Sequence, residues 1–122
     1  MILDSSAVLA FLQEEPGGDA VASALPEAAI SAVNRAEVVA KLRRLGETAL
    51  VSLVLLDLPV LPFTAAETEL AGELVWRHRG VISLGDAACL ATARLRGLPV
   101  LTADRAWARL PPLGVELRFI RG

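Results

Sequence analysis

The chain has 122 residues, a length typical of one domain with its own core. Hydrophobic residues make up 54% and charged residues 21%, which excludes an intrinsically disordered protein. The net charge of −2 excludes a non-specific nucleic-acid coat protein, which would carry a surplus of basic residues. A nuclease stays possible, because an acidic metal site and a local arginine patch can coexist in a chain of low net charge.

The single cysteine, Cys89, excludes an internal disulfide and a cysteine-based zinc site, and it is predicted to be a small packing residue on a helix. The chain starts at Met1 without the basic and apolar segments of a signal peptide. The longest apolar-rich run, residues 49–61, is too short for a membrane span and contains Asp57 and Pro59. We therefore expect a soluble cytoplasmic protein with no membrane partner.

Short apolar runs alternate with longer amphipathic segments, which predicts an α/β fold with a parallel sheet. From the N-terminus we predict a strand over 1–3, helices over 5–13 and 19–25, a strand over 28–30, and helices over 32–45 and 47–58. A strand over 59–63 and helices over 65–79 and 84–96 follow. The chain then forms a strand over 100–101, a helical turn over 105–109 and an edge strand over 115–120.

The helical periodicity also predicts which side chains face the core. On the helix over 65–79, Ala66, Leu70 and Leu74 are expected inward, with Glu67, Glu69 and Glu73 in solvent. On the helix over 84–96, the expected inward residues are Leu84, Ala88, Ala91 and Leu95. Core packing is favoured over base stacking for both tryptophans, Trp76 and Trp107.

Four acidic residues stand at strand–helix junctions. Asp4 follows the first strand, Glu37 lies in the helix after the second, Asp86 begins a helix, and Asp104 follows the strand over 100–101. In a parallel sheet such junctions lie at the same edge, where ligands bind. Four converging carboxylates would repel one another without a cation, and oxygen ligands favour Mg²⁺ or Mn²⁺ over zinc.

Each acid also has a simpler interpretation as a helix cap. Asp4 could cap the helix that begins at Ser5, Asp104 the turn at Arg105, and Ser83–Asp86 and Asn34–Glu37 both fit a capping box. If all four acids are caps, the chain is a non-catalytic α/β interaction module. Metal-dependent cleavage of single-stranded RNA that EDTA abolishes would separate the two interpretations. A phospho-receiver domain is disfavoured, because Lys41 lies mid-chain on a helix rather than near the last strands.

The segments around these acids resemble, in order and spacing, the four acidic motifs of PIN-domain proteins, and among them the VapC-type toxins of bacterial and archaeal toxin–antitoxin pairs. The segments are MILDSSA (1–7), SAVNRAEV (31–38), SLGDAACLA (83–91) and LTADRAW (101–107). The resemblance covers nearly the whole chain and implies a single three-layer α/β/α domain over 1–122, with a central parallel sheet flanked by helices. It implies a metal-dependent endoribonuclease with Asp4, Glu37, Asp86 and Asp104 as its acidic site, supported by Ser6 and Thr102.

Phosphodiester cleavage needs an activated water, neutralised charge on the transition state and help for the leaving oxygen, all of which carboxylate-held Mg²⁺ or Mn²⁺ can supply. Asp4, Glu37 and Asp86 are the expected ligands, and Asp104 would complete the site or orient the water. His78 is expected to be solvated or to touch substrate rather than to act as a base. Candidate contacts to the RNA backbone are Arg43, Arg44, Arg77, Arg79 and Arg105, although each could equally be a solvated surface residue.

The helix over 47–58 is apolar around nearly its whole circumference, which is more than a single core-facing stripe requires. Together with the helix that ends at Leu45, it is predicted to form a homodimer interface or a groove for an antitoxin helix.

Overall fold

The structure is a computed structural model that describes residues 1–122, and it contains five short parallel strands. They are β1 (Ile2–Leu3), β2 (Ile30–Ser31), β3 (Val60–Leu61), β4 (Val100–Thr102) and β5 (Leu117–Phe119). Strand β1 pairs with β4, β4 with β5, and β2 with β3. A parallel bridge between Ile2 and Ala29 joins the two groups, so the strand order is β3-β2-β1-β4-β5.

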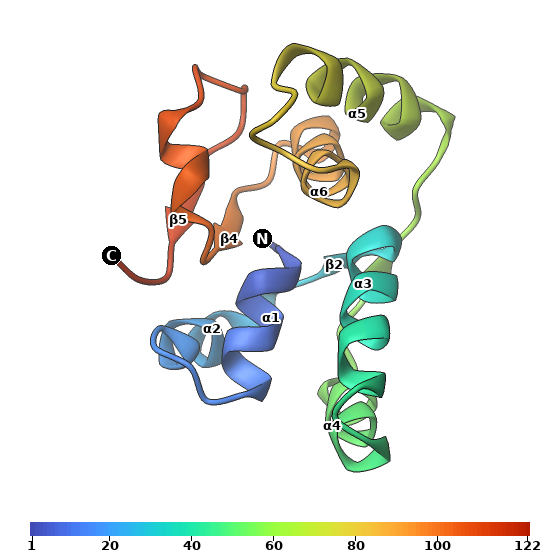
Figure 1. Ribbon diagram of the computed structural model, residues 1–122, viewed down its shortest axis with the longest axis vertical. Coiled ribbons are helices and arrows are strands. Elements are labelled where there is room, and N and C mark those ends of the chain that lie inside the picture. Colours follow the sequence, from blue (N-terminus) through green and yellow to red (C-terminus); the bar gives the residue numbers. More distant parts are fainter.

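Helices cover both faces of these strands, and the predicted α/β fold is confirmed (Figure 1). The α-helices are α1 (Ser5–Leu12), α2 (Gly18–Ala24), α3 (Ala32–Arg43), α4 (Glu47–Leu56), α5 (Ala65–Arg77) and α6 (Leu84–Arg96). Two 3₁₀-helices, η1 (Leu25–Glu27) and η2 (Arg105–Arg109), complete the chain. No helix has the length and apolar character that crossing a membrane requires.

The central strands separate two hydrophobic clusters. Ile2 and Val100 point into a cluster with α5, α6 and Trp107, whereas the next residues along the strands, Leu3 and Leu101, point into a cluster with α1 to α4. Successive strand residues face opposite sides of a sheet, so β1 and β4 are apolar on both faces. The result is the expected layering of helix, sheet and helix.

More residues are buried in the middle of helix α6 than predicted, and the residues predicted to be buried at its two ends are exposed. Ala88 and Ala91 are buried as expected, within an unbroken buried run from residue 87 to 93. Leu84 and Leu95, by contrast, are 61% and 49% exposed. Small side chains allow close packing mid-helix, whereas both ends of the helix reach beyond the packed layer.

The two tryptophans have different environments. Trp107 is 1% exposed, which confirms its predicted place in the core. The prediction for Trp76 is wrong, because this side chain is 67% exposed near the C-terminal end of α5. Arg79 stacks over its indole ring, with the guanidinium carbon 4.0 Å from the ring centroid.

The prediction that Glu67 faces solvent is wrong, because this residue is only 3% exposed. The buried face of α5 is formed by Glu67, Ala71 and Leu74, whereas Ala66 is exposed. The Glu67 carboxylate accepts hydrogen bonds from the Thr64 backbone at 3.0 Å and Arg96 at 2.8 Å, and a further one from the Thr64 hydroxyl. These hydrogen bonds, that of the Thr64 hydroxyl above all, lower the pKa of Glu67 to about 2.

We predict that Glu67→Ala lowers the melting temperature more than the exposed control Glu69→Ala, because it leaves Arg96 and the start of α5 without their acceptor. A lowered pKa means that this stabilisation is present above about pH 4.5 and is lost as the pH falls toward 2. Thermal unfolding followed by circular dichroism at pH 7 measures the difference. Equal melting temperatures for the two variants would contradict the prediction.

Candidate active site

The fold brings the four predicted acids to neighbouring junctions. Asp4 follows β1 directly, Glu37 lies on α3 after β2, and Asp104 follows β4 at the start of η2. Asp86 belongs to the first turn of α6, which packs against β1 and β2. Because β1, β2 and β4 are adjacent and parallel, their carboxyl ends lie at one edge of the sheet.

Asp4 is the most deeply buried of the four acids, with 3% of its surface exposed. Its Oδ2 accepts hydrogen bonds from Ser6 Oγ at 2.6 Å and from Thr102 Oγ1 at 3.1 Å. Burial, together with the nearby Asp86 carboxylate, raises the pKa of Asp4 to about 6, although the two hydroxyls favour the charged form. Ser6 and Thr102, the predicted supporting residues, thus both contact this carboxylate.

The hydroxyls are themselves oriented by the backbone. The N–H of Ala103 donates to Ser6 Oγ and the N–H of Asp104 donates to Thr102 Oγ1, both at 3.0 Å. Each hydroxyl therefore accepts one hydrogen bond and has its own proton free for Asp4. This network connects the carboxylate of Asp4 to the segment that carries Asp104.

Glu37 is held from two helices. Its Oε1 accepts hydrogen bonds from Ser5 Oγ on α1 at 2.8 Å and from Asn34 Nδ2 on α3 at 2.9 Å. The capping-box interpretation of Asn34–Glu37 is wrong, because α3 is capped by Ser31, whose Oγ accepts from the Asn34 N–H. Sequence reasoning did not identify Ser5 as a partner of Glu37 and paired Asn34 with Glu37 only as a capping box, although both residues belong to the motif segments.

Asp86 and Asp104 do serve as caps. Asp86 Oδ2 accepts from the Ser83 N–H at 2.9 Å while Ser83 Oγ accepts from the Asp86 N–H, which is the predicted capping box. Asp104 Oδ1 accepts from the Ala106 N–H at 3.0 Å. Burial raises the pKa of Asp86, and the charges of Asp104 and Glu37 act in the same direction. Asp86 is therefore the acid that is electrostatically coupled to all three others.

All four carboxylates share one pattern. The protein donates hydrogen bonds to only one oxygen of each: Oδ2 of Asp4 and Asp86, Oε1 of Glu37 and Oδ1 of Asp104. The only fully buried side-chain polar atoms without a hydrogen-bond partner are Thr92 Oγ1 and Trp107 Nε1. The second oxygen of each carboxylate is therefore not buried without a partner. No lysine or arginine forms an ion pair with any of these acids.

This donor set has the chemistry of a site for a hard divalent cation, since it offers open carboxylate oxygens and no histidine. Cys89 lies beneath it, but burial and the charges of Asp4, Asp86 and Glu37 raise the pKa of its thiol, so it stays neutral. As the side chains stand, no three acidic, histidine or cysteine groups are close enough to hold a metal ion together. Binding would thus require the mutually repelling carboxylates to draw together around a cation.

The candidate RNA contacts are more scattered than the acids. Arg77 forms an exposed ion pair with Glu73 at 2.8 Å, and Arg79 covers Trp76. Arg105, next to Asp104, stacks over the ring of Phe119. Arg43 and Arg44 are exposed at the far end of α3, where Arg43 is about 9 Å along the helix axis from Glu37. Of the five arginines, only Arg105 neighbours an acid of the site in sequence.

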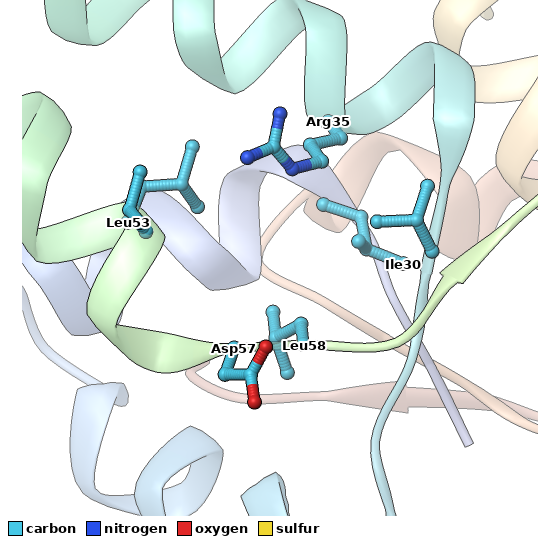
Figure 2. Close-up of a pocket in the computed structure, with 7 residues that line it drawn as sticks. Ile30, Arg35, Leu53, Asp57 and Leu58 are labelled. Carbon is cyan, nitrogen blue, oxygen red and sulfur yellow. The ribbon is translucent and has the colours of Figure 1, made fainter.

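A cavity of about 420 Å³ lies elsewhere, between α3, α4 and the edge strand β3 (Figure 2). None of the four acids lines it. Its walls are mainly apolar, with the Arg35 side chain reaching in from α3 and Asp57 placed across the cavity from it. The cavity is therefore separate from the acidic site.

A parallel sheet between helices, with acids after adjacent strands, defines an α/β protein with an acidic site at the sheet edge. The family model of the PIN domain matches residues 1–112, so the chain belongs to the PIN-domain family. No curated protein matches the chain significantly.

Solved structures of similar fold cover nearly the whole chain. A toxin–antitoxin complex from Klebsiella pneumoniae has a TM-score of 0.74 at 22% identity over 93% of both chains. DNA-bound VapBC from Salmonella typhimurium has a TM-score of 0.76 at 18% identity, over 98% of this chain and 96% of the other. VapBC-5 from Mycobacterium tuberculosis has a TM-score of 0.63 at 24% identity, over 99% and 97%. At these identities the likeness establishes the fold.

The raised pKa of Asp4 predicts that Asp4→Asn stabilises the metal-free protein. Between about pH 3.8 and 6, Asp4 is protonated in the folded chain but ionised in the unfolded chain. The free energy of unfolding that this proton contributes is therefore lost as the pH rises through that range. At pH 7 the charged carboxylate costs about 3 kcal/mol, which the neutral amide removes. Urea denaturation in EDTA from pH 4 to 8 measures the gain.

The difference between variant and parent should grow from pH 4 to 7 and then level off. The exposed Asp19→Asn serves as the control for loss of one negative charge. A constant difference across the pH range would contradict the raised pKa.

Proposed function

We propose that the chain is a metal-dependent endoribonuclease, the VapC-type toxin of a type II toxin–antitoxin pair, with residues 1–122 forming one such domain. One observation carries this proposal: four acids at one sheet edge lack basic partners, and each keeps one carboxylate oxygen free of protein hydrogen bonds. Membership of the PIN-domain family supports it. The assignment as a toxin draws on the toxin–antitoxin complexes of similar fold.

The alternative, an interaction module whose acids are only caps, accounts for two of the four residues. Asp86 and Asp104 cap helices, but the side chain of Asp4 makes no capping hydrogen bond and Glu37 lies inside α3. A carboxylate buried without a basic partner destabilises the fold, and Asp4 does so without providing a cap. Such a cost is typical of a functional site.

In the proposed mechanism the free oxygens of Asp4, Glu37 and Asp86 would hold Mg²⁺ or Mn²⁺. When bound, the ion supplies charge neutralisation at the scissile phosphate and acidifies water. Ser6 and Thr102 hold the Asp4 carboxylate in place, and Ser5 and Asn34 hold that of Glu37. Asp104 would orient the attacking water with the oxygen that does not cap η2. RNA is the proposed substrate, with Arg105 the nearest candidate contact in sequence.

Asp86→Asn tests the catalytic role against the capping role. As a cap, the residue would lose only the interaction of its charge with the helix dipole, roughly 0.3 to 1 kcal/mol. As a metal ligand, it would lose cleavage by orders of magnitude while the protein stays folded. The measurement is the cleavage rate of a single-stranded RNA under saturating Mn²⁺, with EDTA abolishing the wild-type activity.

Ser83→Ala is the matched control, because it removes the other half of the same capping box. It should cost about 1 kcal/mol of stability and leave the cleavage rate near wild type. Wild-type cleavage by Asp86→Asn, or full activity of the parent in EDTA, would refute the metal-site mechanism.

The partner surface that we propose comprises α4 and the turn at Leu45 that follows α3. Leu45, Val51, Val54 and Leu55 are 58%, 53%, 58% and 77% exposed, so the predicted apolar face of α4 has no cover within the chain. Val54 also lines the cavity of Figure 2, so the surface is continuous with a hollow that contains both apolar side chains and the charged residues Arg35 and Asp57. Such a surface suits a second copy of the chain or an apolar helix of an antitoxin.

We expect light scattering at tens of micromolar to show a homodimer that Leu55→Lys converts to a monomer, because a buried lysine would be left unpaired. Glu69→Lys, on the exposed face of α5, should leave the mass unchanged. A wild-type monomer would contradict the homodimer and leave an antitoxin as the proposed occupant of the surface.

A further inference from the structure

Asn34 is a polar side chain with no exposed surface, at the point where α1, α3 and α6 meet. Its Nδ2 lies 2.9 Å from Glu37 Oε1, 3.0 Å from the Gly85 carbonyl oxygen and 3.2 Å from Ser5 Oγ. Its Oδ1 accepts a hydrogen bond from the Ser31 hydroxyl. The two amide protons thus serve Glu37 and Gly85 at the shorter distances, which leaves no unused donor on the amide.

Besides Ser5 and Asn34, Gly85 also packs against the Glu37 carboxylate. A Cβ built on Gly85 would lie 2.1 Å from Glu37 Oε2, so the carboxylate occupies the space of a side chain at position 85. Asn34 donates to the carbonyl of this same glycine. One amide group therefore connects the Glu37 carboxylate to the first turn of α6, immediately before Asp86.

This geometry restricts a flexible side chain. Glu37 would otherwise sample many rotamers, and fixing it costs conformational entropy that the hydrogen bonds offset. Because Ser5 and Asn34 both donate to Oε1, they leave Oε2 as the oxygen available for a ligand. Outer groups of this kind orient metal ligands in other sites, and their loss weakens metal binding.

We propose that Asn34 is a positioning residue that fixes the Glu37 carboxylate relative to Asp86 for binding of a divalent cation, an inference that rests on the proposed function. Asn34 does not touch substrate or metal and acts through Glu37. The Gly85 position must remain without a side chain for the same reason.

The test measures Mn²⁺ affinity by calorimetry on the whole chain. Asn34→Ala should weaken binding by roughly 10- to 100-fold, as other outer-group substitutions do. In a Glu37→Gln background the same substitution should change the affinity by less than about 2-fold, because its effect is transmitted through the carboxylate. A purely structural role of Asn34 would give the same loss in both backgrounds.

Two further variants guard against failure to fold. Asn34→Leu fills the volume that Asn34→Ala leaves empty, and folding is checked by circular dichroism. Gly85→Ala leaves the Asn34 amide in place as a donor, but its added Cβ displaces the Glu37 carboxylate. The same substitution raises the helix propensity of α6. Gly85→Ala should therefore melt near the wild-type temperature and still lose Mn²⁺ affinity, and Ser83→Ala, which leaves both contacts in place, should not lose it.

The outcomes separate the two hypotheses. If the parent binds Mn²⁺ and cleaves RNA but Asn34→Ala and Asn34→Leu bind like Ser83→Ala, the positioning role is overturned and the proposed function stands. If both Asn34 variants unfold, wild-type affinity of Gly85→Ala overturns the positioning role. A parent that neither binds Mn²⁺ nor cleaves RNA overturns the proposed function and the positioning role with it.

Discussion

The burial of the Asp4 carboxylate without a cationic partner is the constraint that organises this molecule. Asp4 immediately follows β1, the central strand, which is joined to the β2–β3 pair by the Ile2–Ala29 bridge and pairs with β4 on its other side. That pairing brings Thr102 to the carboxylate, and the first turn of α1 brings Ser6. Two hydroxyls replace only part of the hydration that burial removes, so the pKa of Asp4 stays raised. A bound cation would offset the remaining cost, which couples the stability of the fold to the site.

Capping and metal binding are often treated as alternatives, but this geometry allows both. A helix cap uses one carboxylate oxygen as an acceptor for a backbone N–H, and the other oxygen stays free. Asp86 and Asp104 follow this pattern with Ser83 and Ala106. The cap fixes the rotamer of each acid before any ligand arrives. The simpler interpretation of these two residues is therefore correct and still compatible with the proposed site.

The sequence predicted the strand–helix alternation and the position of the acids because both depend on local patterns. Apolar runs two or three residues long are enough to mark β1 and β4, which are buried on both faces. The start of α6 followed from the Ser83–Asp86 capping box, and the predicted ends of α3 and α6 lie within two residues of the observed ones, although Ser31 was not recognised as the cap of α3. The acids then fell at one sheet edge as a consequence of parallel topology.

What the sequence did not predict depends on contacts between distant elements. Glu67 looked like a solvent-facing acid because its partner Arg96 lies 29 residues away on α6. Trp76 was expected in the core, but no other helix or strand covers this side chain near the end of α5. The contacts of Glu37 with Ser5 and Gly85 were missed for a similar reason, since these residues belong to other helices, α1 and α6. Short-range patterns thus locate acidic groups, whereas the side chains that orient those groups become visible only once the helices are packed.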